Sequence, residues 1–155
     1  MVRKIIICLA GLLMLGIGSM SAQGYDEEKQ AMTNFIVRMY KNAPFEGVKV
    51  FTDYENSYLL SILSLDPDKY PNASAMNRVA GVKAMSQASR YFNGSDITSD
   101  LIIHSVERAD GTGDSEIIEN IRERSAGYVK ALELLTCFDG GDGWKVFVFA
   151  KQLDY

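Results

Sequence analysis

The sequence predicts an α+β fold in which one long alanine-striped helix packs on an antiparallel sheet, with an extra helix and hairpin before it. Residues 71–94 carry small and apolar residues at helical spacing, and the segments on either side alternate like strands. Hydrophobic content of 47% and charged content of 23% are ordinary for a globular protein, and 155 residues suit one domain. These observations favour a helix lying on a sheet around a single core.

The stretch 71–94 is expected to form the central helix. Its apolar stripe consists of Ala73, Met76, Ala80, Ala84, Ala88 and Tyr91. The alanines are small, so the helix can lie close to the sheet that it covers. Asn77 and Gln87 interrupt the stripe. Asn72 or Ser74 can cap the first turn, and Gly94 suits the end of the helix.

The N-terminus has the order of parts that is typical of a secretory signal peptide. Arg3 and Lys4 precede an apolar run over residues 5–17, and small residues follow over 19–24. We expect cleavage after Ala22 or Gly24, which leaves residues 1–22 as a signal and 23–155 as a single α+β domain. The apolar run is shorter than the roughly 20 residues of a membrane span. Since no cysteine lies near residues 19–25, a lipid anchor is not expected either.

Charge and cysteine content restrict the partners and the compartment. Loss of residues 1–22 removes two basic residues and no acid, and changes the net charge from −4 to −6. An acidic chain is a poor ligand for nucleic acid or for an anionic membrane surface. Cys137 then remains as a lone cysteine, so no internal disulfide is expected. We expect an exported protein, periplasmic or extracellular, without a membrane span after signal cleavage.

The remaining elements follow from hydrophobic patterning. We expect a helix over 26–41, a hairpin of strands 47–53 and 58–65, and strands over 96–108, 126–138 and 144–153, the last two forming a second hairpin. Strands 58–65 and 144–153 are apolar on both faces, which indicates an interior position. Residues 115–124 fit either a helix or a strand, and extended structure is preferred there.

The small and apolar pattern of residues 58–153 resembles that of a known family. Alanines recur every fourth residue at Ala80, Ala84 and Ala88, and a Ser-x-Gly-Tyr-Val step occupies residues 125–129 before the final hairpin. This pattern resembles small envelope proteins grouped around the LPP lipoproteins and the N-terminal domain of flagellar assembly protein T. The resemblance implies a helix packed on an antiparallel sheet, an exported location and a non-catalytic envelope role. The chain departs from that family in its missing lipobox and its additional N-terminal helix and hairpin.

Residues that could support catalysis or metal binding do not form a recognisable constellation. His104 is the only histidine, and it could pair with Cys137 as a base for a nucleophile. Acidic glycine-rich stretches at 110–116 and 139–143 could hold calcium, but their spacing does not match an EF-hand loop. The glutamates that could supply a hydrolytic carboxylate pair are Glu55, Glu107, Glu116, Glu119, Glu123 and Glu133. We expect no catalytic, cofactor-binding or metal-ligating residue, and a packed Cys137.

The sequence favours a non-catalytic module that binds a protein or a cell-wall component. Exposed aromatic residues such as Tyr40, Tyr54 and Tyr70 would then contribute to binding together with loops. Two other classes stay open: a hydrolase that uses carboxylates, and a surface protein that assembles with itself. A deep cleft with two carboxylates would favour the former, and a free sheet edge would favour the latter.

Overall fold

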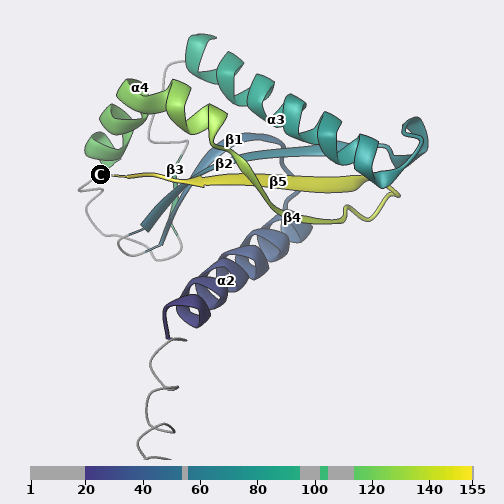
Figure 1. Cartoon of the computed structure of the whole chain (residues 1–155), viewed down its shortest axis with the longest axis horizontal. Helices are drawn as coiled ribbons and strands as arrows, with labels where there is room; N and C mark the ends of the chain where they lie inside the picture. The colour runs from purple at the N-terminus through teal and green to yellow at the C-terminus, as the bar shows by residue number, and fades with distance from the viewer. Residues whose placement is uncertain (1–19, 54–55, 95–101, 105–113, 155) are drawn as a thin grey trace, which may run out of the picture. The chain divides into compact units, whose positions relative to one another are not determined.

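The computed structural model describes residues 20–53, 56–94, 102–104 and 114–154. The chain divides into two compact units, Met1–Arg38 and Met39–Tyr155. Its elements are α2 (Met20–Asn42), β1 (Gly47–Asp53), β2 (Asn56–Leu65), the short 3₁₀ helix η2 (Pro67–Lys69), α3 (Ala73–Gly94), β3 (Ile102–His104), α4 (Asp114–Lys130), β4 (Glu133–Asp139) and β5 (Lys145–Gln152). The first unit contains most of α2, and the second contains the sheet with α3 and α4 (Figure 1).

The predicted α+β class is confirmed, with a five-stranded mixed sheet in the order β3-β1-β2-β5-β4. The pairs β1–β2, β2–β5 and β4–β5 are antiparallel, so both predicted hairpins and the interior positions of β2 and β5 are confirmed. The short β3 pairs parallel with β1, which makes the sheet mixed rather than wholly antiparallel. Of the strand expected over 96–108, the structure describes only residues 102–104.

Helix α3 packs on the sheet through the predicted alanine stripe. Ala80, Ala84 and Ala88 are fully buried. The Ser61 hydroxyl of β2 donates a 3.1 Å hydrogen bond to the backbone carbonyl of Ala84, a contact that needs a small side chain at this position. Gln87, which interrupts the stripe, donates to the Ser61 Oγ at 3.3 Å and to the Ile62 carbonyl at 3.1 Å. These bonds satisfy buried polar atoms and fix α3 over β2.

The start of α3 confirms one of the two proposed caps. The Asn72 side-chain carbonyl accepts a 2.8 Å hydrogen bond from the backbone N–H of Ala75. An N-terminal turn leaves its backbone donors without helical partners, and an asparagine before the first turn satisfies one of them. Asn72 is therefore the cap.

The preference for extended structure over 115–124 is wrong, because α4 covers Asp114–Lys130 as a helix. It also includes residues 126–130, which were expected to begin a strand, so β4 starts only at Glu133. Ile117, Ile121, Tyr128 and Val129 are buried on one face of α4. They join a cluster with Val48 and Leu59 of the sheet, and this burial outweighs the strand preference of the β-branched and aromatic residues.

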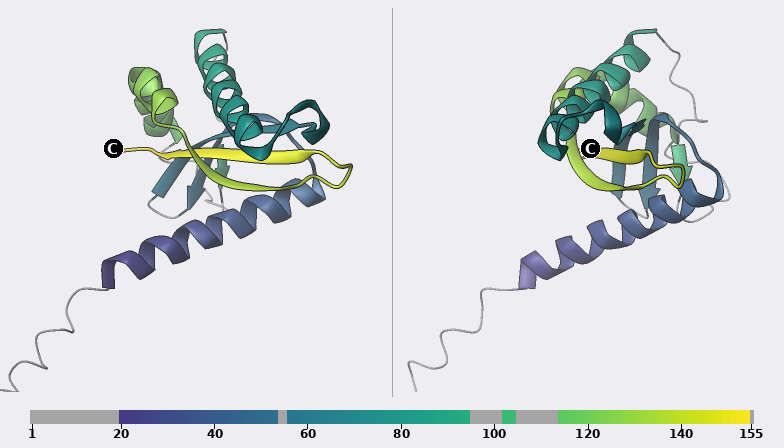
Figure 2. Two further views of the ribbon diagram at one scale, coloured as in Figure 1. Left: turned by 45° about the vertical axis from the view of Figure 1, so that its right-hand side comes forward. Right: turned by 90° about the vertical axis from the view of Figure 1, so that its right-hand side faces the viewer.

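Helices α3 and α4 lie over the same face of the sheet, as Figure 2 shows. One cluster under α3 contains Leu63, Leu65, Phe147 and Phe149 together with Ala80 and Ala84. The opposite face of the sheet is apolar too, with Leu60, Ile62, Val146 and Val148 fully buried. Apolar residues on both faces explain why β2 and β5 are interior strands.

Candidate functional site

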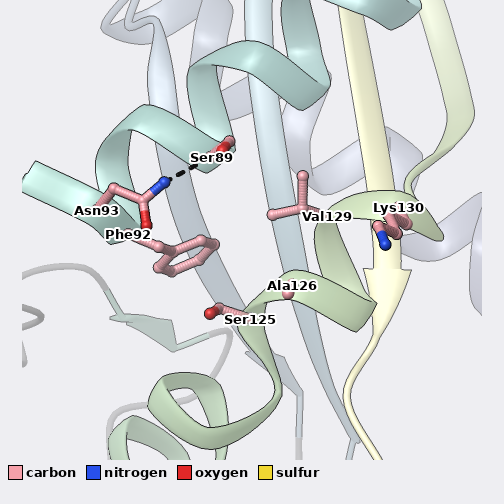
Figure 3. A pocket seen from close by; sticks show the side chains of 7 residues that line it. All are labelled: Ser89, Phe92, Asn93, Ser125, Ala126, Val129 and Lys130. Atoms are coloured by element: carbon pink, nitrogen blue, oxygen red, sulfur yellow. Dashed lines mark hydrogen bonds between the residues drawn. The ribbon is translucent and has the colours of Figure 1, made fainter.

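A pocket of about 160 Å³ lies between the last turns of α3 and the second half of α4 (Figure 3). It is lined by Ser89, Phe92, Asn93, Ser125, Ala126, Val129 and Lys130. Each lining residue belongs to one of these two helices. The pocket is therefore formed by the helix layer, on residues far apart in the sequence.

Helical spacing places the lining residues on facing surfaces. Ser89, Phe92 and Asn93 are three and four residues apart on α3, and Ser125, Ala126, Val129 and Lys130 follow the same spacing on α4. Val129 is buried in the core cluster, and Phe92 packs against that cluster. The two helices are thus held at the pocket by the same apolar contacts that form the core.

The pocket combines an apolar interior with a polar rim. Phe92, Ala126 and Val129 supply the apolar surface, while hydroxyl, amide and ammonium groups come from Ser89, Asn93, Ser125 and Lys130. The Asn93 amide donates to the Ser89 Oγ at 3.3 Å (Figure 3). No carboxylate and no histidine is among these lining residues. Apolar surface with a few polar groups at its edge is a combination common in ligand-binding pockets.

A hydrogen-bond network behind the pocket fixes α4 to the end of the described chain. The Tyr128 hydroxyl lies 2.6 Å from the Asn120 Oδ1 and 3.2 Å from the Asp154 carbonyl oxygen. Asn120 and Arg124 each donate to the same Asp154 carbonyl at 3.0 Å. Because three side chains of α4 hold one backbone group, the helix that forms one wall of the pocket is firmly positioned.

The expectation of a packed Cys137 is wrong, since this cysteine is exposed on β4. β4 is the last strand on its side of the sheet, which leaves its side chains less covered than those of β5. Partial burial of the thiol raises its pKa, and the nearby Asp139 raises it further, while Lys145 lowers it. The thiol is therefore accessible but weakly nucleophilic at neutral pH.

The other residues considered for chemistry are not brought together. His104 lies on β3 at the opposite edge of the sheet from Cys137 on β4, which argues against a pair of the two. Asp139 forms a 2.6 Å salt bridge with Lys145, whereas Asp110, Glu55 and Glu107 lie outside the described residues. The glutamates on α4 and β4, namely Glu116, Glu119, Glu123 and Glu133, are all exposed. Within the described part of the chain, no group of three possible metal ligands occurs.

The three tyrosines expected as exposed aromatics differ in their surroundings. Tyr40 is buried, with its ring 5.5 Å from that of Phe138 and 6.0 Å from that of Phe45, so this expectation is wrong. Tyr70 is half-buried, and Tyr54 lies outside the described residues. Among the residues with described side chains, Trp144 is instead the exposed aromatic one, 39% accessible, with the Lys69 ammonium 5.6 Å above its ring.

The pocket was not predicted from the sequence. Ser89 and Asn93 are polar residues on the side of α3 away from the alanine stripe, and residues 126–130 were expected in a strand. The run of small residues Ser125, Ala126 and Gly127 is the one signal that could have indicated a close approach of two helices.

Comparison with protein-family models, curated proteins and solved structures finds no match to this chain. The resemblance to the LPP lipoproteins and the flagellar assembly protein therefore stays a prediction. None of the helices described between residues 20 and 154 has both the length and the apolar character that a bilayer crossing requires.

Proposed function

We propose that the protein is an exported, non-catalytic binding module of the cell envelope or the cell exterior, with a protein or cell-wall component as its partner. The observation that carries this proposal is the α3–α4 pocket, which has an apolar interior and a polar rim, with no carboxylate and no histidine among its described lining residues. Pockets with a few polar groups around apolar surface are typical of ligand sites.

The pocket suggests how the partner is bound. An apolar side chain of the partner enters between Phe92, Ala126 and Val129 and removes their surface from water. The Ser125 hydroxyl and the Lys130 ammonium then bind a carbonyl or carboxylate next to that side chain. A volume of about 160 Å³ accommodates one side chain rather than a whole ligand, so most of the contact area lies outside the pocket.

A pocket-filling substitution tests this proposal. Ala126 is exposed within the pocket, so Ala126→Leu occupies the space without disturbing the core. Ala43→Leu adds the same group to an exposed alanine that does not line the pocket and serves as the matched control. In a pull-down from cell-envelope extract, we expect Ala126→Leu to lose a partner that the unchanged protein and Ala43→Leu both retain.

A hydrolase substrate panel examines the main alternative. Turnover of any substrate that is lost in Glu116→Gln or Glu133→Gln would replace the binding proposal with a carboxylate-dependent hydrolase.

Export is examined separately by the intact mass of the secreted protein. We expect a chain that begins at Gln23 or Tyr25, and an added diacylglyceryl group or a retained Met1 would contradict this.

Self-assembly is the second candidate function, favoured by the position of β4 at the edge of the sheet. Leu134 on this strand is 44% exposed, and Cys137 is exposed on the same strand. An edge strand offers backbone groups to another strand, and an apolar side chain there strengthens such pairing. If two copies pair through β4, light scattering detects a dimer that Leu134→Lys removes, and a monomer at all concentrations excludes it.

A further inference from the structure

The outward surface of α3 has a charge unlike that of the whole chain. The chain has 20 acidic and 16 basic residues, but α3 contains Arg78, Lys83 and Arg90 and no acidic residue. Arg78 and Lys83 have no ion pair with any residue in the described ranges. α3 is thus a cationic helix on an acidic protein, which points to a partner with negative charge.

Apolar residues accompany these cations on the side of α3 that faces away from the sheet. Val82 is 64% exposed, although a valine gains nothing from exposure to water. Ala75, Val79 and Val82 form a shallow apolar groove with Arg78 and Lys83 along its sides. Val79 also packs against the core cluster under α3, whereas no core contact accounts for the exposed Val82.

The spacing of this surface is typical of a seam between two helices. We define the outer stripe as Ala75, Val79, Val82, Ser86, Ser89 and Asn93, which alternate by four and three residues. Small residues at several of these positions allow another helix to approach closely. The stripe ends at the candidate pocket, because Ser89 and Asn93 also line it.

We propose that the outer stripe of α3 binds an amphipathic helix of a protein partner, with acidic residues on both sides of its apolar face. This inference rests on the proposed binding function and specifies the chemistry of the partner. From Ala75 to Asn93 the stripe is about 27 Å long at 1.5 Å per residue, which corresponds to roughly 18 residues of the partner helix. The apolar face of that helix covers Val79 and Val82, and its acidic flanks pair with Arg78, Lys83 and Arg90.

A lipid surface fits these observations less well than a helix does. The C-terminal half of the stripe consists of Ser86, Ser89 and Asn93, which gain little from contact with acyl chains. The contact between two helices is narrow and can include both apolar and polar residues, as the outer stripe does.

A pair of synthetic peptides tests the proposal directly. The probe is a labelled helix of three heptads with leucine at the a and d positions and glutamate at e and g, and its twin has lysine at e and g. By fluorescence anisotropy, we expect the glutamate peptide to bind the purified protein at least tenfold more tightly than its twin. Added salt should weaken this binding, because exposed charges are screened.

Substitutions in the outer stripe provide the matched controls. Val82→Glu should lower the affinity for the glutamate peptide at least tenfold. Lys41→Glu changes the charge of an exposed residue outside α3 and should leave that affinity unchanged. The double variant Arg78→Glu, Lys83→Glu should reverse the preference toward the lysine peptide. Circular dichroism of each variant establishes that the fold is retained.

Other outcomes overturn the proposal. Equal binding of both peptides, or equal loss in Val82→Glu and Lys41→Glu, excludes recognition by the stripe. Binding to vesicles with one-quarter phosphatidylglycerol, without binding of the glutamate peptide, assigns the surface to lipid. If the glutamate peptide does not bind but Ala126→Leu still loses a partner in the pull-down, only the helix proposal is refuted. If the peptide does not bind and Ala126→Leu loses no partner, the proposed binding function is refuted as well.

Discussion

Replacement of Gly81 by alanine tests how closely α3 approaches β5. Gly81 lies in the interior of α3, and a methyl group at this position would meet the Phe149 ring at 3.7 Å from Cε1 and 3.8 Å from Cζ. These are ordinary van der Waals distances, so the added carbon fits without any movement. Gly81→Ala should therefore stabilise the protein.

The expected gain has two parts. Alanine is favoured over glycine in a helix interior by about 1 kcal/mol. The new methyl group also contacts Phe149. A fully buried CH₂ contributes about 0.8 kcal/mol to stability, and we take roughly half of that value because the methyl group would be covered on one side only. The free energy of unfolding should rise by about 1.4 kcal/mol, the sum of these two estimates, and Tm by several degrees.

Gly127→Ala on α4 is the matched control, because a methyl group there meets no atom within 4 Å. It should give the helix contribution alone, about 1 kcal/mol. Urea unfolding followed by circular dichroism measures both variants. If Gly81→Ala destabilises the protein, or gains less than Gly127→Ala, the described approach of α3 to Phe149 is wrong.

Three further changes examine the packing and the exposed thiol. Ala84→Leu should lower the free energy of unfolding by about 1–3 kcal/mol, because Ser61 bonds the carbonyl of this residue and leaves no room for a larger side chain; an unchanged urea midpoint would contradict this. Tyr128→Phe removes the hydroxyl bonded to Asp154 and should cost about 1 kcal/mol while speeding amide exchange of Asp154, and unchanged exchange would refute the network. Burial raises the pKa of the Cys137 thiol, so iodoacetamide should label it slowly at pH 7, and the labelling rate should still be rising at pH 9; a rate that levels off below pH 9 would contradict the raised pKa.

The sequence was informative where a pattern is local. The stripe of Ala80, Ala84 and Ala88 depends on spacing alone, and burial of all three confirmed it. The patterns of β2 and β5 likewise predicted their interior positions in the sheet. Both strands carry apolar side chains on each of their two faces, and both faces must therefore be shielded from water.

The errors arose where long-range packing decides the outcome. Tyr128 and Val129 prefer strands in isolation, but in the fold they complete the face of α4 that Ile117 and Ile121 begin. The acidic start at Asp114 and the basic Lys130 at the end were available helix signals that the interpretation did not use. Since α4 was not expected to be a helix, the pocket that it forms with α3 could not be predicted either.

The exposure of Cys137 depends on strand order, which no local pattern encodes. The residues next to it, Thr136 and Phe138, would suit an edge strand as well as an interior strand, so the local sequence does not distinguish the two. Cys137 is exposed because β4 is an edge strand, paired with β5 on one side only. The burial of Tyr40 against Phe138 has a similar origin, because these residues are far apart in the sequence.

Site-specific photocrosslinking in the producing cell tests most directly whether the helix layer is a binding surface. A benzophenone amino acid replaces Ala126 in the pocket in one strain and Ala43, outside the pocket lining, in another. The binding account predicts a discrete adduct with a second protein from position 126 that is absent from position 43. No adduct at position 126, or the same adducts from both positions, would contradict the claim that α3 and α4 form the binding site.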